Sequence, residues 1–259
     1  SQSTSFPYYF NLSEDKELTF TPILNYGGGI DSSQRFKFDY NQILSGGNLK
    51  TNLTFDTTFE NKNSEKWLKE GSLINIYNKN INEKFNLIFS SALETSKNYI
   101  QQTNPNNDLS YSSSLNTSLD IYGYNLNKID DKLRINLTNY QSNQNGEDNK
   151  TLPTIFPYIE FYSGEKNLAS FKYSNNFEFY NIMRNSPTDI HAKKQRKISS
   201  LVNFNKEIFK YASKITFETN IYNQFFNTED KKVDNKYITS NYFRSFPIFG
   251  ITAETPFKI

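Results

Sequence analysis

Apolar and polar residues alternate with a period of two along much of the chain. In residues 49–59, Leu53 and Phe55 lie on one side of an extended backbone, and Asn52 and Asp56 lie on the other. This is the pattern of a β-strand with one apolar and one polar face. The same alternation recurs in residues 35–42, 84–91, 132–139, 170–180 and 213–226. The runs predict roughly 12 or 13 strands of about 8 to 14 residues, and a tilted strand needs ~9 to 11 residues to cross a bilayer.

The segments between these runs predict turns and loops, because they are rich in Gly, Asn, Asp and Ser. No 3.6-residue periodicity is sustained, so no long helix is expected. The longest predicted connections span residues 96–110, 185–196 and 226–236. Short turns and long polar loops do not alternate in the sequence as cleanly as in a typical outer-membrane barrel. The composition has no break that would mark a second domain, so residues 1–259 are expected to form one domain.

The composition favours sheet structure, with 23 Phe and 18 Tyr beside a single Trp and a single Met. The mean hydropathy of −0.73 is low, but the polar residues alternate with apolar ones instead of forming charged tracts, which argues against disorder. The net charge of +2 is spread along the chain and gives no nucleic-acid footprint. Without cysteine, the chain has neither disulfides nor thiolate metal ligands.

The relation of the chain to membranes follows from its apolar runs. No run approaches the ~18 apolar residues of a membrane helix, which excludes a helical membrane protein. The chain opens with SQSTSFPYYF, which has neither a basic nor an apolar signal region. We therefore expect an export signal, if there is one, to lie outside this sequence, and we expect the chain to be a fragment.

The two-faced strands favour an all-β fold, an antiparallel transmembrane β-barrel. In such a barrel the aromatic face meets lipid and the polar face lines a wet lumen. The predicted lumen residues have mixed signs, which indicates a wet passage without ion selectivity: Lys37, Asp39, Lys50, Asp56, Arg134 and Glu178. A soluble β-sandwich is the alternative, although its core would have to hold an unusual number of Phe and Tyr rings.

Candidate chemistry is sparse. His191 is the only histidine and stands near Asp189, but one histidine in a loop-like segment is weak evidence for a Ser, His and acid set. Ligands for a metal do not cluster in the sequence. Gly27, Gly28 and Gly29 lack the spacing of a phosphate-binding loop and are expected to form a turn or bulge. A basic cluster could contact phosphates, but a solvated loop end is the favoured interpretation: Lys193, Lys194, Arg196 and Lys197. We predict no catalytic residue, cofactor or metal, and no enzyme.

The most specific stretch is residues 7–22, PYYFNLSEDKELTFTP. It resembles the first barrel hairpin of the lipopolysaccharide-assembly family LptD (OstA), in which Pro, aromatic residues and Asn begin the first strand and Thr-x-Thr-Pro lies in the second. The matching positions are Pro7, Tyr8, Tyr9, Phe10, Asn11, Thr19, Thr21 and Pro22. Ser13 and Glu14 stand where the family often has Ala-Pro, which leaves the turn geometry open. Weaker similarity continues along nearly the whole chain.

The resemblance implies the N-terminal part of an outer-membrane barrel that transports lipopolysaccharide and inserts it into the outer leaflet. It implies location in the cell outer membrane and four partners: lipopolysaccharide, an LptE-type lipoprotein plug, periplasmic jellyroll bridge proteins and outer-membrane lipid. The family's barrel has about twice the strands predicted here and follows a periplasmic jellyroll. This chain could then not close a barrel by itself.

Proline in both strands of the first hairpin raises the question of a gate. Proline cannot donate to a sheet ladder, so Pro7 and Pro22 would weaken the seam between the first and last strands. We predict that this seam is a lateral gate, which an amphiphile needs because its acyl chains must enter the bilayer. Ordinary edge protection is the alternative explanation for these prolines. Alternative functions are a general porin, a siderophore-type receptor, or a soluble surface β-sandwich.

Overall fold

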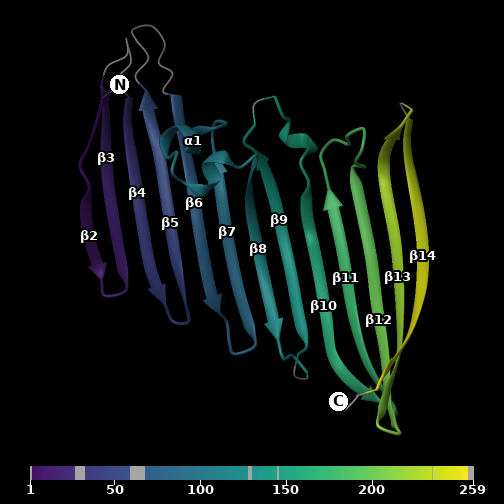
Figure 1. Ribbon diagram of the computed structural model, residues 1–259. Helices are drawn as coiled ribbons and strands as arrows, with labels where there is room; N and C mark the ends of the chain where they lie inside the picture. Colours follow the sequence, from purple (N-terminus) through teal and green to yellow (C-terminus); the bar gives the residue numbers. More distant parts are fainter. Residues whose placement is uncertain are drawn as a thin grey trace. The chain divides into compact units, whose positions relative to one another are not determined.

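The computed structural model describes residues 2–26, 33–58, 68–127, 130–144, 146–234 and 236–255. Strands make up 74% of the structure and helices 5%. The strands form one antiparallel sheet in the hydrogen-bonded order β1-β3-β4-β5-β6-β7-β8-β9-β10-β11-β12-β13-β14, with β2 also paired to β3 (Figure 1). The sheet is not closed into a barrel. The predicted all-β, antiparallel fold is confirmed, and the open sheet agrees with part of a barrel.

The chain divides into two compact units, which are described separately: residues 1–119 with 138–152 form unit 1, and residues 120–137 with 153–259 form unit 2. The first seven strands belong to unit 1: β1 (Gln2–Ser5), β2 (Tyr8–Ser13), β3 (Lys16–Tyr26), β4 (Ser33–Leu44), β5 (Gly47–Thr58), β6 (Leu68–Asn80) and β7 (Phe85–Glu94). Two strands contribute to both units: β8 (Ser114–Tyr124) and β9 (Lys132–Ser142). The last five belong to unit 2: β10 (Thr154–Leu168), β11 (Phe171–Met183), β12 (Lys194–Lys210), β13 (Ser213–Val233) and β14 (Lys236–Glu254). A single domain over residues 1–259 stays a prediction.

The helices are short, as expected: α1 (Tyr99–Thr103), η1 (Asp108–Tyr111) and η2 (Asn149–Thr151). Among the described helices, none has the length and hydropathy of a membrane span.

Short turns and long loops alternate between the ends of the strands more cleanly than the sequence indicates. In unit 1, residues 14–15, 45–46 and 81–84 form short turns at one end, and the long connections 95–113 and 143–153 leave the other end. Unit 2 repeats this with the turns at 169–170 and 211–212 and the loop at 184–193. The tight β13–β14 connection is the exception. The turn predicted at Gly27, Gly28 and Gly29 lies outside the described residues.

Two of the predicted long connections are shorter than expected, because charged residues continue the strands. β12 already begins at Lys194, and β13 runs to Val233. Lys194 and Arg196 in β12 form ion pairs with Glu229 in β13, at 3.1 and 2.7 Å. Cross-strand pairs of this kind let a polar, loop-like sequence remain in a sheet. The expected loops at residues 185–196 and 226–236 are therefore wrong at these ends.

The register places the apolar residues of each unit on one face. In unit 1, Phe20 lies opposite Phe38, which lies opposite Leu53, and the row continues through Leu73 and Leu93. The rings of Phe20 and Phe38 have centroids 4.8 Å apart. An equivalent row crosses unit 2: Ile159, Phe179, Ile198, Phe225 and Phe243. The alternate positions form the other face, which carries most of the charges, so the two-faced strands are confirmed.

Few apolar side chains are buried. The buried apolar residues among those described are Ala92, Tyr99, Ile100, Leu115 and Ala192. A sandwich covers its apolar faces with a second sheet, but the described strands form one sheet whose apolar rows stay largely uncovered. The sandwich expected as the alternative fold is therefore not what the strands form.

Candidate functional site

The first strand of the hairpin is interrupted at Phe6 and Pro7, beside Pro22. β1 and β2 both pair with β3, and Ser5 lies opposite Ile23 while Tyr8 lies opposite Phe20. The register is the same on both sides of the interruption, so Phe6 faces Pro22 and Pro7 faces Thr21. The amide of Phe6 donates to the carbonyl oxygen of Pro22 at 3.2 Å. Counted as one interrupted strand, β1 and β2 bring the described sheet to the upper end of the predicted strand number.

The hydrogen-bond pattern assigns a different missing donor to each proline. Opposed residues of an antiparallel pair alternate between exchanging two bonds and exchanging none. Phe6 and Pro22 form a bonded pair, so the amide that Pro22 lacks is the one that would have reached the carbonyl of Phe6. Pro7 and Thr21 form the next, non-bonded pair, so the backbone nitrogen of Pro7 faces away from β3.

The two prolines therefore act on two different ladders. Pro7 removes a donor from the outer edge of the first strand, and Pro22 removes one from the ladder that holds this strand to β3. The gate hypothesis placed both missing donors at a single seam, and the register separates them. One lost backbone bond is worth about 0.5–1.5 kcal/mol net, and about 1–3 kcal/mol where the remaining carbonyl stays unsatisfied.

Side-chain contacts on both faces of the sheet stabilise the rest of the hairpin. On the polar face, the hydroxyl of Tyr9 donates to Glu17 at 2.9 Å, and Asn41 in β4 donates to the same carboxylate at 2.8 Å. On the apolar face, the rings of Tyr8 and Phe20 stack with centroids 6.4 Å apart. The weak point is thus confined to the segment beside Phe6 and Pro7. Tyr8 and Tyr9 are 53% and 63% exposed, so the outer edge of β2 is uncovered among the described residues.

A long loop is bound to the polar face of unit 1. Arg35 in β4 donates two hydrogen bonds to Asp56 in β5, at 2.7 and 2.9 Å. The hydroxyl of Tyr99 in α1 donates to the same carboxylate at 2.8 Å. Tyr99 is 1% exposed, and burial, followed by the bond to Asp56, raises the pKa of its phenol. These three residues form the Arg35–Asp56–Tyr99 clamp, which holds the loop 95–113 on the predicted lumen face. Figure 1 shows α1 beside β6.

Apolar contacts support the clamp. Ile100 of α1 packs with Ala92 of β7 and Leu115 of β8, and Ile74 and Leu109 border this cluster. This small apolar cluster is the core of unit 1, and it lies between the loop and the sheet. The polar face is therefore partly covered by the loop in unit 1.

The connection that follows β9 is hydrogen-bonded to the loop 95–113. The side chain of Asn143 accepts from the amide of Asn98 at 2.8 Å and donates to the carbonyl of Ser112 at 3.1 Å. The side chain of Gln141 in β9 likewise bonds both backbone groups of Glu94. Sequence reasoning missed Tyr99, Asn143 and the role of Gln141, because residues in irregular loops carry no periodic signal.

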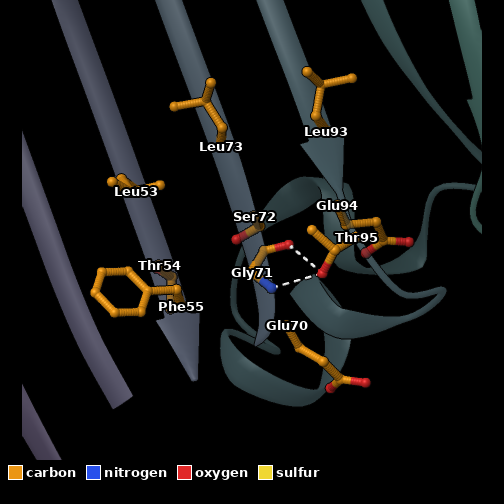
Figure 2. Close-up of a pocket in the computed structure, with 10 residues that line it drawn as sticks. All are labelled: Leu53, Thr54, Phe55, Glu70, Gly71, Ser72, Leu73, Leu93, Glu94 and Thr95. Atoms are coloured by element: carbon orange, nitrogen blue, oxygen red, sulfur yellow. Dashed lines mark hydrogen bonds between the residues drawn. The ribbon is translucent and has the colours of Figure 1, made fainter. Parts of the chain in front are cut away.

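An apolar recess lies on the other face of unit 1. Its volume is about 290 Å³, and Leu53, Phe55, Leu73 and Leu93 line it. Gly71, which lies opposite Phe55, contributes only its backbone to the lining. Figure 2 shows Gly71 bonded through its backbone to Thr95, with the amide of Gly71 2.7 Å from the Thr95 hydroxyl.

The remaining candidates among the described residues have other bonding partners. The backbone of His191 bonds with Thr188 in the loop 184–193, and the neighbouring Asp189 pairs with Lys232 at 3.1 Å. No group of three or more potential metal ligands gathers among the described residues. The predicted basic cluster is largely taken up by ion pairs, since Lys194 and Arg196 pair with Glu229 and Lys197 pairs with Glu178 at 3.4 Å.

Comparison with protein-family models and with curated proteins finds no match for this chain.

Proposed function

We propose that this chain is part of an outer-membrane β-barrel that transports lipopolysaccharide and releases it sideways into the outer leaflet at the first hairpin. The single observation that carries the proposal is the pair of missing donors at the Phe6–Pro22 and Pro7–Thr21 positions. The likeness of this hairpin to the LptD family and the uncovered apolar rows support it.

The chemistry of the substrate explains why a weak first strand is useful. An amphiphile with acyl chains and a large sugar head cannot leave through a closed pore, because its chains must enter the hydrocarbon layer while its head stays in water. Every backbone donor and acceptor in that layer must be paired, so an ordinary barrel seam does not open. The first strand lacks one outer donor and is also bonded less firmly to β3. It can therefore separate from the last strand of the barrel at a lower free-energy cost.

The proposal carries the partners implied by the resemblance. They are an LptE-type lipoprotein plug, periplasmic jellyroll bridge proteins and outer-membrane lipid. In this proposal the cell outer membrane is the location, and the chain has no enzymatic role. The alternation of short turns with long loops supports the location, because outer-membrane barrels have short periplasmic turns and longer external loops.

The first test restores the missing donors in the full-length protein. Pro22→Ala gives the carbonyl of Phe6 a donor, and Pro7→Ala gives the outer edge one. We expect the double variant to slow the delivery of lipopolysaccharide to the cell surface by up to about tenfold, which corresponds to the ~1.4 kcal/mol of one net hydrogen bond. Pro187→Ala, in the loop 184–193, is the control and should leave delivery unchanged. Unchanged delivery in the double variant would refute the gate.

The second test locks the hairpin without altering the prolines. Tyr9 and Thr19 form a non-bonded pair, whose Cα separation of about 4.5 Å suits a disulfide. The chain has no cysteine, so Tyr9→Cys with Thr19→Cys would form the only bridge within it. We expect oxidation to stop delivery and reduction to restore it. The same bridge between Lys37→Cys and Thr54→Cys, in the interior β4–β5 pair, should have no effect.

A general diffusion pore is the second candidate, and one observation favours it. The loop 95–113 is clamped on the predicted lumen face by Tyr99, which would narrow an open channel. In that case, release of the clamp in a reconstituted full-length protein should raise single-channel conductance, and the Pro7 and Pro22 variants should leave lipopolysaccharide delivery unaffected.

A further inference from the structure

A row of aromatic and cationic side chains crosses the polar face of unit 2. Tyr158 in β10 lies opposite Tyr180 in β11, which lies opposite Lys197 in β12. Lys197 in turn lies opposite Phe226 in β13, and Phe226 lies opposite Tyr242 in β14. Neighbouring strands are about 4.8 Å apart, so the five side chains form a continuous track across five strands.

Cations lie over the rings along this track. The guanidinium of Arg134 in β9 lies 5.6 Å from the ring of Tyr122 and 5.7 Å from that of Tyr158. The ammonium of Lys197 lies 5.2 Å from the ring of Tyr180, and Tyr158 and Tyr180 have ring centroids 4.6 Å apart. These contacts orient the rings by cation–π attraction. The track is thus an ordered surface of ring faces and edges.

A row of hydrogen-bonding groups runs beside the rings. Glu160 lies opposite Glu178, then Ser199, Gln224 and Arg244 follow in register. The hydroxyl of Ser199 donates to Glu178 at 3.0 Å, and that of Tyr158 donates to Glu160 at 3.0 Å. The row therefore offers carboxylate, hydroxyl, amide and guanidinium groups next to an aromatic surface.

Two ion pairs hold charges on and beside the track. The cations there are Lys132, Arg134, Lys197 and Arg244, and the carboxylates are Asp120, Glu160 and Glu178. Arg134 is 3.0 Å from Asp120 and Lys197 is 3.4 Å from Glu178. A polyanion would have to break these pairs, so the track suits a neutral, polar ligand.

One end of the track opens into a hollow. It has a volume of about 530 Å³, within the usual range for ligand sites. The residues that line it include Tyr122, Tyr124, Arg134, Glu160 and Tyr162. The hollow thus combines three tyrosine side chains with an acid, a guanidinium and the ammonium of Lys132.

We propose that this track binds a neutral oligosaccharide chain. A sugar ring has an apolar face of C–H groups, which packs on an aromatic ring, and a rim of hydroxyls, which both donate and accept hydrogen bonds. The track offers both surfaces side by side, repeated from strand to strand. This binding does not depend on the lateral release of lipopolysaccharide, because the track lies in unit 2 and uses none of the first hairpin.

The test measures oligosaccharide binding to the detergent-purified full-length protein. The probe is a neutral linear glucose hexasaccharide, titrated by calorimetry and observed by saturation-transfer NMR. We expect Tyr158→Leu with Tyr180→Leu to weaken binding by about tenfold, since two ring contacts are lost. Tyr158→Phe with Tyr180→Phe keeps both rings and should stay within about threefold of the original affinity.

Matched controls lie on the other face of β11. Phe177→Leu with Phe179→Leu removes two rings from the apolar face of β11 and should leave binding unchanged, and circular dichroism verifies that each variant is folded. Two outcomes would overturn the proposal: equal loss in these control variants, or no binding of the hexasaccharide where inorganic phosphate binds. Failure of the Pro7 and Pro22 tests with intact hexasaccharide binding would overturn the gate alone.

Discussion

Removal of one hydroxyl from the Arg35–Asp56–Tyr99 clamp should loosen the loop 95–113 while the strands stay intact. Tyr99→Phe keeps the buried ring and deletes only the 2.8 Å bond to Asp56. Asp56 still holds both bonds from Arg35, so its charge remains compensated. The variant therefore isolates a single hydrogen bond to a charged group, worth about 1.5–3 kcal/mol.

This magnitude sets the expected change in local opening. A loss of about 1.5–3 kcal/mol raises the open population of the loop by roughly 10- to 150-fold. The amides of Gln102 and Asn104 report on it, because they bond to the carbonyls of Asn98 and Ile100 at 3.0 and 2.8 Å and exchange only when the turn opens. We expect their hydrogen exchange to accelerate by that factor, while amides within β4 and β5 keep their protection.

A neighbouring tyrosine supplies the control. Tyr111 is 76% exposed, so Tyr111→Phe should leave exchange in α1 unchanged. A change below threefold at Asn104 in Tyr99→Phe, or an equal change in Tyr111→Phe, would refute the view that the hydroxyl holds the loop on the sheet.

Three further outcomes are expected. Asn143→Leu, which removes both side-chain bonds of Asn143 to the neighbouring loop, should also accelerate exchange in α1, by a factor measurable in the same experiment. Gly71→Val should lower the unfolding temperature, because even a Cβ there would lie 2.8 Å from a carbonyl oxygen of β5; normal stability would show that the strands can shift apart. The pKa of Tyr99 is raised above its ordinary ~10, so its stabilising bond is fully present below pH 10 and is lost only as the pH rises through the higher folded value. Exchange in α1, corrected for the intrinsic rate, should therefore be constant from pH 6 to 9.

The proposals differ in what supports them. The gate combines the register of the first hairpin with a family resemblance, whereas the oligosaccharide track depends on the register and contacts of unit 2 alone. A protein that binds the hexasaccharide but delivers lipopolysaccharide normally with Pro7 and Pro22 replaced would be a sugar-binding barrel without a proline gate. The two sets of variants separate these cases.

The sequence by itself determined the fold class and the two faces of the strands. Alternation with period two is a local property, and each strand must place its apolar side away from water whatever its neighbours are. Leu53, Phe55 and Phe179 could therefore be assigned to the apolar face without a structure. Strand ends were less predictable, since Lys194 and Arg196 resemble loop residues until Glu229 is seen across the ladder.

Tertiary structure alone decided which groups meet. Which ladder each of Pro7 and Pro22 weakens depends on register, and a slip of one residue in the first strand would turn the backbone nitrogen of Pro7 toward β3. The bond from Tyr99 to Asp56 joins an irregular loop to a distant strand, and the row from Tyr158 to Tyr242 needs five strands aligned at once. Such contacts are non-local, so they cannot be predicted from the periodicity within a single strand.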